Sequence, residues 1–207
     1  MQILPYIITI VCAYILGSSN MAYYISKIKK VDVKNSGSKN LGASNATMIL
    51  GWYAGVLSGV HDILKAVLAV ILANLIFPEA AHIGAIAGVA CVLGHIFPFY
   101  LKFNGGKGFA SFIGAILALN FKAGAIIVIC AIIAALIVNY MVGATTTVIV
   151  ASPIVFSVLA HSFVPGLILL VASLIIAIKH IENYARIYNG TEFRLRKAFV
   201  KKPDYNA

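Results

Sequence analysis

Residues 109–178 read FASFIGAILALNFKAGAIIVICAIIAALIVNYMVGATTTVIVASPIVFSVLAHSFVPGLILLVASLIIAI and contain one charged side chain, Lys122. A membrane-spanning helix needs about 20 predominantly apolar residues. This stretch of 70 residues therefore predicts three or four apolar helical segments. We place them at roughly 109–121, 123–141, 143–163 and 165–178.

The composition of the whole chain agrees with a bilayer as its solvent. Of 207 residues, 61% are hydrophobic and 11% are charged, whereas soluble domains contain about 45–50% apolar and about 25% charged residues. A mean hydropathy of +0.97 excludes an ordinary soluble enzyme and a disordered chain. The cysteines Cys12, Cys91 and Cys130 lie in apolar runs and are predicted to be small buried hydrophobic residues.

Further spans precede the quoted stretch. The first 26 residues carry no charge and lack the basic start of a signal peptide, so residues 3–25 are predicted to be a retained span. Its four small or polar residues, Gly17 to Asn20, are expected to face other helices or a wet cavity. The segment 27–48 is too polar to cross a membrane.

Two more spans are predicted before residue 102. One begins near Gly51, enters the bilayer near Asp62 and ends before Pro78, and the other covers about 82–101. Asp62 and Lys65 are three residues apart on one helix face, where they can form an ion pair.

The charges indicate which way the chain is oriented. Five lysines lie in 27–48, two in 102–107 and seven Lys or Arg from residue 179 onward, so fourteen of the sixteen basic residues lie on one side. The positive-inside rule makes that side cytoplasmic. The predicted fold is one domain, 1–207, an all-α polytopic membrane helix bundle with about seven transmembrane helices. Its amino terminus is outside and its carboxyl terminus inside; five spans with re-entrant segments would give the same sidedness.

Three polar segments fall on the cytoplasmic side of this topology. In the first, residues 35–47, glycines at 37 and 42 allow backbone N–H groups to converge on an anion, with Ser and Asn side chains as further donors. The alternative is a solvated Gly/Ser linker.

The second polar segment is Asn104-Gly105-Gly106-Lys107-Gly108, directly before an apolar helix. A helix amino terminus with a glycine-rich approach and one lysine is suited to phosphate. The residues around the Gly-Lys pair do not match a Walker A loop. A tight turn with a lysine on the cytoplasmic side is the alternative.

The third polar segment is Lys179-His180-Ile181-Glu182-Asn183-Tyr184, at the end of the last span. Histidine titrates near neutrality and asparagine donates without charge, so an acid–base or hydrogen-bonding role is possible; anchoring of a helix end is the alternative. His95 is either a site residue or a core histidine. The spacing of the five histidines does not favour a zinc site, and we expect no metal and no cofactor.

Four motifs in this order resemble the bacterial acyl-phosphate:glycerol-3-phosphate acyltransferase family (PlsY type), over nearly the whole chain. They are Gly37-Ser38-Lys39-Asn40-Leu41-Gly42-Ala43-Ser44-Asn45, Asp62-x-x-Lys65, Gly94-His95-x-Phe97-Pro98 through Gly108, and His180-x-Glu182-Asn183.

The resemblance implies a membrane enzyme that moves a fatty acyl group from acyl phosphate to the 1-hydroxyl of glycerol 3-phosphate. Its products are lysophosphatidic acid and phosphate, the first step of phospholipid synthesis. It also implies a multi-pass protein of the bacterial cell membrane whose site faces the cytoplasm. The expected partners are acyl phosphate, glycerol 3-phosphate and membrane lipids, and no nucleic acid.

The resemblance also implies roles for individual residues. The expected catalytic residues are Ser38, Lys107, His180 and Asn183. The expected substrate and phosphate contacts are Gly37, Asn40, Gly42, Asn45, His95, Gly105, Gly106 and Gly108. Asp62, Lys65 and Glu182 are expected to give structural support.

This chain departs from the family pattern at two phosphate positions. Met48 stands where the family has arginine, and Val142 where it has serine, with Thr145 retaining a hydroxyl nearby. Two alternatives therefore stay open. One is a paralogue of the same fold with another acceptor or with only phosphate or phospholipid binding, and the other is a small membrane transporter.

Overall fold

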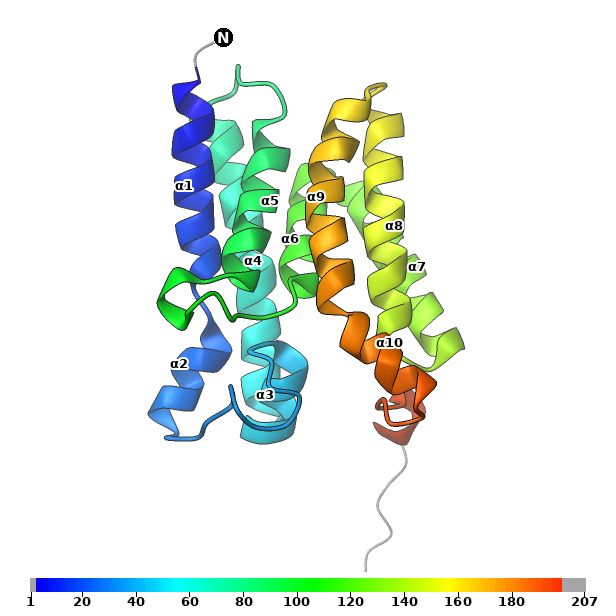
Figure 1. Ribbon diagram of the computed structural model, residues 1–207. Helices are drawn as coiled ribbons and strands as arrows, with labels where there is room; N and C mark the ends of the chain where they lie inside the picture. Colours follow the sequence, from blue (N-terminus) through cyan, green and yellow to red (C-terminus); the bar gives the residue numbers. More distant parts are fainter. Residues whose placement is uncertain (1–2, 199–207) are drawn as a thin grey trace, which may run out of the picture.

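The computed structural model describes residues 3–198, in which every regular element is a helix (Figure 1). The α-helices are α1 (Leu4–Ser18), α2 (Met21–Ile28), α3 (Ala43–Leu50), α4 (Trp52–Ile76), α5 (Ile83–Ile96), α6 (Phe109–Leu119), α7 (Phe121–Val138), α8 (Met141–Leu159), α9 (Phe163–Lys179) and α10 (Ile181–Tyr188). The described part of the chain also contains the short 3₁₀ helices η1 (Phe99–Leu101) and η2 (Leu195–Ala198). The expected all-helical membrane architecture is confirmed.

Within residues 3–198, five helical stretches are long and apolar enough to cross a membrane: Leu4–Ile28, Trp52–Ile76, Ile83–Leu101, Phe121–Val138 and Met141–Leu159. A sixth requires α9 and α10, which are bent by 41° relative to each other, to act as one span. The apolar α6 has only 11 residues. Every predicted apolar segment is therefore a helix, whereas the expected count of about seven crossings stays a prediction.

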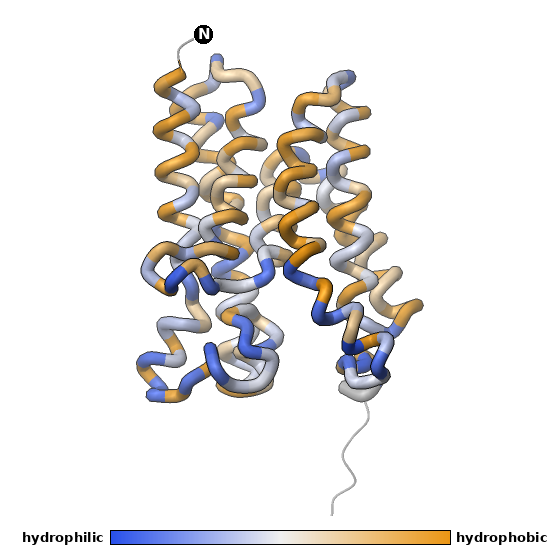
Figure 2. Tube along the Cα trace, in the orientation of Figure 1, coloured by the Kyte–Doolittle hydropathy of each residue, from blue (hydrophilic) through white to orange (hydrophobic). Residues whose placement is uncertain are grey.

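Polar residues gather at one end of the bundle. Figure 2 shows hydrophilic positions concentrated in the lower half, around α2, α3, α10 and the loop before α6. Apolar side chains cover the outer faces of the remaining helices, with Ile7 50%, Ile133 51% and Leu174 56% exposed. This predominantly apolar surface suits contact with lipid tails, because apolar side chains need no hydration.

Small residues let α1 and α5 cross closely. A Cβ on Gly17 would lie 2.0 Å from the carbonyl oxygen of Cys91, and one on Gly94 would lie 2.1 Å from that of Tyr14. The prediction that the small residues near position 17 face another helix is confirmed. Beyond the break at Ser19, Asn20 starts α2 by accepting a hydrogen bond from the Tyr23 N–H at 2.9 Å.

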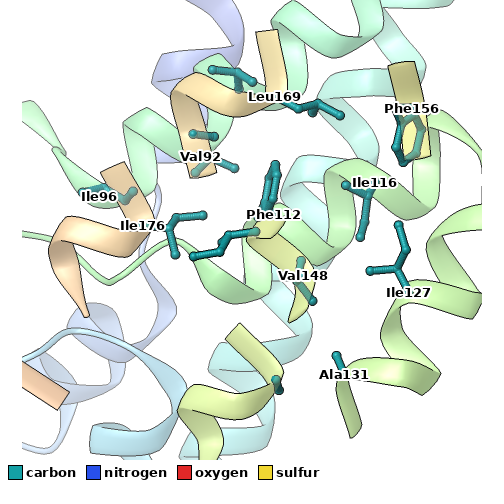
Figure 3. Packing of buried hydrophobic residues seen from close by; sticks show 14 of the residues in the cluster. Val92, Ile96, Phe112, Ile116, Ile127, Ala131, Val148, Phe156, Leu169 and Ile176 are labelled. Carbon is teal, nitrogen blue, oxygen red and sulfur yellow. The ribbon is translucent and has the colours of Figure 1, made fainter. Parts of the chain in front are cut away.

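The largest core cluster joins the helices that lead into the polar end. Phe112 of α6 is fully buried among residues of α5, α8 and α9 (Figure 3). Near the polar end of this core, Gly108 packs between Ile96 and Ile176, since a Cβ there would lie 2.7 Å from Ile96 and 3.1 Å from Ile176. The core thus fixes the loop before α6 relative to the end of α9.

One expectation needs correction. Cys12 and Cys130 are exposed on the bundle surface, and only Cys91 is buried, because a membrane helix exposes its apolar face to lipid. The segment 27–48, predicted to be too polar to cross a membrane, contains the end of α2 and most of α3. Lys201 and Lys202, counted among the cytoplasmic basic residues, lie outside the described residues.

Candidate active site

Asn45 organises the first polar loop. Its side chain is fully buried. Asn45 Oδ1 accepts the Ser38 N–H at 2.9 Å, and its Nδ2 donates to the carbonyls of Val33 and Ser36, each at 3.0 Å. Gly37 adopts a φ of 61°, and a Cβ there would lie 2.3 Å from Asn45 Oδ1. The Asn45 amide therefore shapes the loop, and its hydrogen-bonding capacity is used inside the protein.

The loop ends at the amino terminus of α3. Gly42 is the N-cap and supplies no side-chain cap, and the first helical bond runs from the Ala46 N–H to the Gly42 carbonyl. The N–H groups before Ala46 have no partner within the helix, and they carry the positive end of its dipole. The half-buried Ser38 and Asn40 belong to the same loop. This arrangement suits an anion.

The first polar loop is tied to the segment that precedes the second. Lys34 Nζ donates to the Leu101 carbonyl at 3.0 Å, and the buried Leu101 packs in one cluster with Val33 and Leu41. Among the described residues, no hydrogen bond joins Ser38 to Lys107 or His180.

The glycines of the second loop pack against the end of α5. The Gly105 N–H donates to the Ile96 carbonyl at 3.0 Å, and the Gly106 N–H donates to that of His95 at 3.1 Å. A Cβ on Gly106 would lie 2.0 Å from His95 Nε2. Because both N–H groups are already paired, the two glycines position the loop; their expected phosphate contacts stay a prediction.

Lys107 and Asn183 are 76 positions apart in the sequence but in contact in the fold, where Lys107 Nζ donates a hydrogen bond to Asn183 Oδ1. Burial lowers the pKa of the Lys107 ammonium, and the nearby Arg186 guanidinium lowers it further. The group is therefore a cation held in a partly desolvated site, where its attraction for an anion is stronger than at the surface.

His180 is held in one tautomer. It is 7% exposed, and its Nδ1 lies 2.8 Å from the Ile176 carbonyl. Because a carbonyl only accepts, Nδ1 carries the hydrogen and Nε2 of the neutral ring offers a lone pair. His180 can thus accept a hydrogen bond from a hydroxyl group.

Asn183 is surrounded by two residues that were not predicted from the sequence, Arg186 and Glu192. Asn183 Nδ2 donates to Glu192 Oε1 at 2.8 Å, and Arg186 Nε donates to Glu192 Oε2 at 2.6 Å. The expected brace, Glu182, has a side chain 77% exposed and lies 3.9 Å from Arg186. A sequence signal existed only for Arg186, which follows Asn183 by three helix positions.

A buried ionic cluster lies beneath the second loop. Lys65 Nζ lies 2.8 Å from Asp62 Oδ1, 2.9 Å from His95 Nδ1 and 2.7 Å from the Ser19 carbonyl. The predicted pairing of Asp62 with Lys65 is confirmed. His95 is 3% exposed and belongs to this cluster, so it lies in the protein core, directly behind Gly106.

The positions that depart from the family pattern lie apart from these networks. Met48 is 57% exposed on α3, and Val142 is 3% exposed. Thr145, the expected substitute hydroxyl, is buried and bonds to Met141 of its own helix at 3.4 Å. The neighbouring Thr146 instead meets the Tyr184 hydroxyl at 2.6 Å and so links α8 to α10.

Comparisons with known proteins find similarity over nearly the whole chain. The model of the family described as glycerol-3-phosphate acyltransferase matches residues 7–190. A glycerol-3-phosphate acyltransferase of Coxiella burnetii is 34% identical over 194 residues, which cover 93% of this chain and 100% of the relative. Glycerol-3-phosphate acyltransferase 1 of Oceanobacillus iheyensis is 31% identical over 204 residues, covering 95% and 98%.

Two solved structures are also similar. One is the crystal structure of PlsY, an integral membrane glycerol 3-phosphate acyltransferase, in its glycerol 3-phosphate form, with a TM-score of 0.85 and 29% identity over 94% of this chain and 99% of that chain. The other is its lysophosphatidic acid form, with a TM-score of 0.77 and 30% identity over 91% and 94%.

Proposed function

The chain belongs to the glycerol-3-phosphate acyltransferase family, and we propose that it transfers a fatty acyl group from an acyl phosphate to the 1-hydroxyl of glycerol 3-phosphate. The reaction yields lysophosphatidic acid and inorganic phosphate. The observation that carries this proposal is the contact of Lys107 with Asn183. The nearby His180 bonds to the Ile176 carbonyl through Nδ1, which leaves its Nε2 free to accept a hydrogen bond.

The chemistry needs little from the protein beyond positioning and charge. An acyl phosphate is a mixed anhydride, so the substrate hydroxyl attacks the acyl carbon, the bond from that carbon to the phosphate oxygen breaks, and phosphate leaves with the electron pair. No covalent enzyme intermediate is required. Orientation of the two substrates and stabilisation of developing negative charge are sufficient sources of rate.

Lys107 supplies the fixed cation. Asn183 holds its ammonium group at the start of α6, where the helix dipole adds positive potential. We assign Lys107 to a substrate phosphate, where its charge offsets the charge that builds up as the anhydride bond breaks.

His180 orients the acceptor. Its Nε2 accepts a hydrogen bond from the glycerol hydroxyl, and the proton released on attack passes to this nitrogen or to the departing phosphate. Burial favours the neutral ring that this role requires.

The first loop provides a second anion site. Ser38, Asn40 and the free N–H groups at Gly42 and beyond are assigned to the other phosphate, with Asn45 and Gly37 maintaining the loop. No arginine contributes here, because position 48 is methionine.

The protein is a multi-pass membrane protein, and we place it in the bacterial cell membrane with the polar end in the cytoplasm. The distribution of Lys and Arg supports this orientation. Glycerol 3-phosphate is charged and does not enter hydrocarbon, so its site must open to water.

Phosphate release tests the proposal. Purified protein given palmitoyl phosphate and glycerol 3-phosphate is expected to release inorganic phosphate only when both are present. Release without the acceptor would indicate simple hydrolysis. Binding of glycerol 3-phosphate with no release at millimolar acceptor would refute transfer and favour a paralogue that only binds.

A further inference from the structure

The segment after α10 folds back toward the candidate active site. Gly190 has a φ of 70°, which reverses the chain, and the Thr191 and Glu192 N–H groups then donate to the Arg186 carbonyl at 2.8 and 3.1 Å. The family model's match ends at residue 190. Glu192 therefore comes from a segment beyond that match.

This segment is also fixed to the turn between α7 and α8. The Leu195 N–H donates to the Asn139 carbonyl at 3.0 Å, and the Arg196 N–H donates to Asn139 Oδ1 at 2.8 Å. Arg194 Nε donates to the Tyr140 hydroxyl at 3.3 Å. Glu192 is thus held between two anchored points, the end of α10 and this turn.

Glu192 reaches into the protein. Its side chain is 10% exposed although it follows a helix end. One carboxylate oxygen accepts from Asn183 and the other from Arg186. A buried carboxylate is costly unless it is paired in this way, so the pairing gives Glu192 one stable position.

The contacts with Glu192 and with Lys107 require the same orientation of the Asn183 amide. An asparagine amide can turn by 180° and keep its shape, but a carboxylate can only accept hydrogen bonds. Glu192 therefore requires the NH₂ group of Asn183 on its side, which leaves Oδ1 facing Lys107. With a neutral amide at position 192, the contact at that position would be satisfied by either orientation of Asn183, and Lys107 alone would select between them.

We propose that Glu192 is a positioning residue for acyl transfer, which fixes Asn183 so that its carbonyl oxygen holds the Lys107 ammonium group in place. The inference rests on the proposed function for the role of Lys107. The contacts themselves do not depend on which reaction the protein catalyses.

Glu192 also stabilises the charged form of Lys107. The charged and titratable groups around Lys107 are Arg186 and Lys179, which lower its pKa, Glu182 and Glu192, which raise it, and His180. Removing the charge of Glu192 removes one attraction, and a reversed Asn183 amide would present a donor to the ammonium group. Both changes lower the pKa of Lys107.

The first measurement needs no turnover. The reaction of Lys107 with acetic anhydride is followed against pH by peptide mass spectrometry in the wild type, in Glu192→Gln and in Glu79→Gln. The last removes an exposed carboxylate in the connection between α4 and α5, at the other end of the bundle (Figure 1). In Glu192→Gln, Lys107 is expected to titrate about half a unit lower and, at a pH below its pKa, to react about threefold faster. Glu79→Gln should match the wild type.

Kinetics complete the test. For Glu192→Gln, kcat/KM for glycerol 3-phosphate should fall about tenfold, as expected for a misplaced charged hydrogen bond. Glu192→Asp keeps an anion that only accepts, and should bring the Lys107 titration back toward the wild type. Thermal melting of each variant in detergent checks its folding.

The outcomes separate the two proposals. An unchanged Lys107 titration in Glu192→Gln would overturn the positioning role, whether or not activity or melting temperature falls. A shifted titration in a protein with no transferase activity in any form would support the role of Glu192 and refute the proposed function.

Discussion

Lys107 joins two separate elements of the candidate active site. Its backbone belongs to the loop that packs on α5, while its ammonium group contacts Asn183 of α10. A cation in a partly buried site acts on a substrate charge with less screening than at the surface. We therefore expect catalysis to depend on this single side chain.

Replacing Lys107 with alanine should lower kcat/KM for acyl transfer at least about a hundredfold, the effect typical of removing one fixed electrostatic group. Phosphate release with palmitoyl phosphate and glycerol 3-phosphate gives the measurement. Lys102→Ala is the matched control, because Lys102 is exposed on the same loop. Equal activity of the two variants would remove Lys107 from the mechanism.

The buried cluster offers a second test on single residues. Asp62→Asn leaves the Lys65 ammonium group in the membrane region without its anion, which is 2.8 Å away in the native protein. Breaking a buried pair costs about 3–5 kcal/mol, whereas removing both charges costs much less. Unfolding in detergent should therefore show Asp62→Asn well below the wild type and the double variant Asp62→Asn, Lys65→Met between them. A double variant less stable than the single one would contradict a paired role.

At the scale of elements, α1 packs closely against α5, the helix that leads into the site-forming loop. Gly94 of α5 faces the backbone of α1, and just beyond it His95 closes the buried cluster. The site-forming loop then leaves from the end of α5. A substitution that separates α1 from α5 is therefore expected to shift the loop that carries Lys107.

Gly94→Ala should destabilise the protein by about 1–3 kcal/mol, because the added Cβ would lie 2.1 Å from the Tyr14 carbonyl. Gly59→Ala, in α4, is the control, since its Cβ would lie at an ordinary 3.5 Å from Ala43. Thermal melting in detergent compares them. A melting temperature for Gly94→Ala at or above that of Gly59→Ala would show that close packing of α1 on α5 is not needed.

The sequence predicts the elements better than their contacts. The apolar runs locate α4 to α9 within a few residues, because length and apolarity are local properties. The pairing of Asp62 with Lys65 follows from helix geometry. The helix α3 was missed, since its first turn is polar and carries no apolar period.

The remaining contacts depend on tertiary structure. The family resemblance implies phosphate contacts for Gly105 and Gly106, and these stay a prediction. The hydrogen bonds of their N–H groups to carbonyls of α5 could not be predicted, because they depend on how the loop packs against that helix. Likewise, the contact of Glu192 with Asn183 depends on a chain reversal at Gly190. No local pattern around Glu192 indicates which side chain it will meet.

At the scale of the whole molecule, the polar end collects the candidate site and the apolar helix faces surround the rest (Figure 2). The connection of α4 to α5 lies at the opposite end from the first polar loop (Figure 1). These two segments are therefore expected on opposite sides of the membrane.

Cysteine labelling tests this orientation. In a variant with Cys12, Cys91 and Cys130 replaced by serine or alanine, Ala81→Cys should react with a membrane-impermeant maleimide on intact cells. Asn35→Cys should react only after the cells are permeabilised. Both positions are exposed, so labelling of both in permeabilised cells is the control. The reverse pattern would contradict a cytoplasmic site.

The most direct test of acyl transfer at Lys107 and Asn183 is the identity of the product. Purified protein, palmitoyl phosphate and glycerol 3-phosphate are incubated together, and the lipid product is identified by mass spectrometry. We predict 1-palmitoyl lysophosphatidic acid from the wild type and almost none from Lys107→Ala. Free palmitate as the main product, or the same yield from both proteins, would contradict the account.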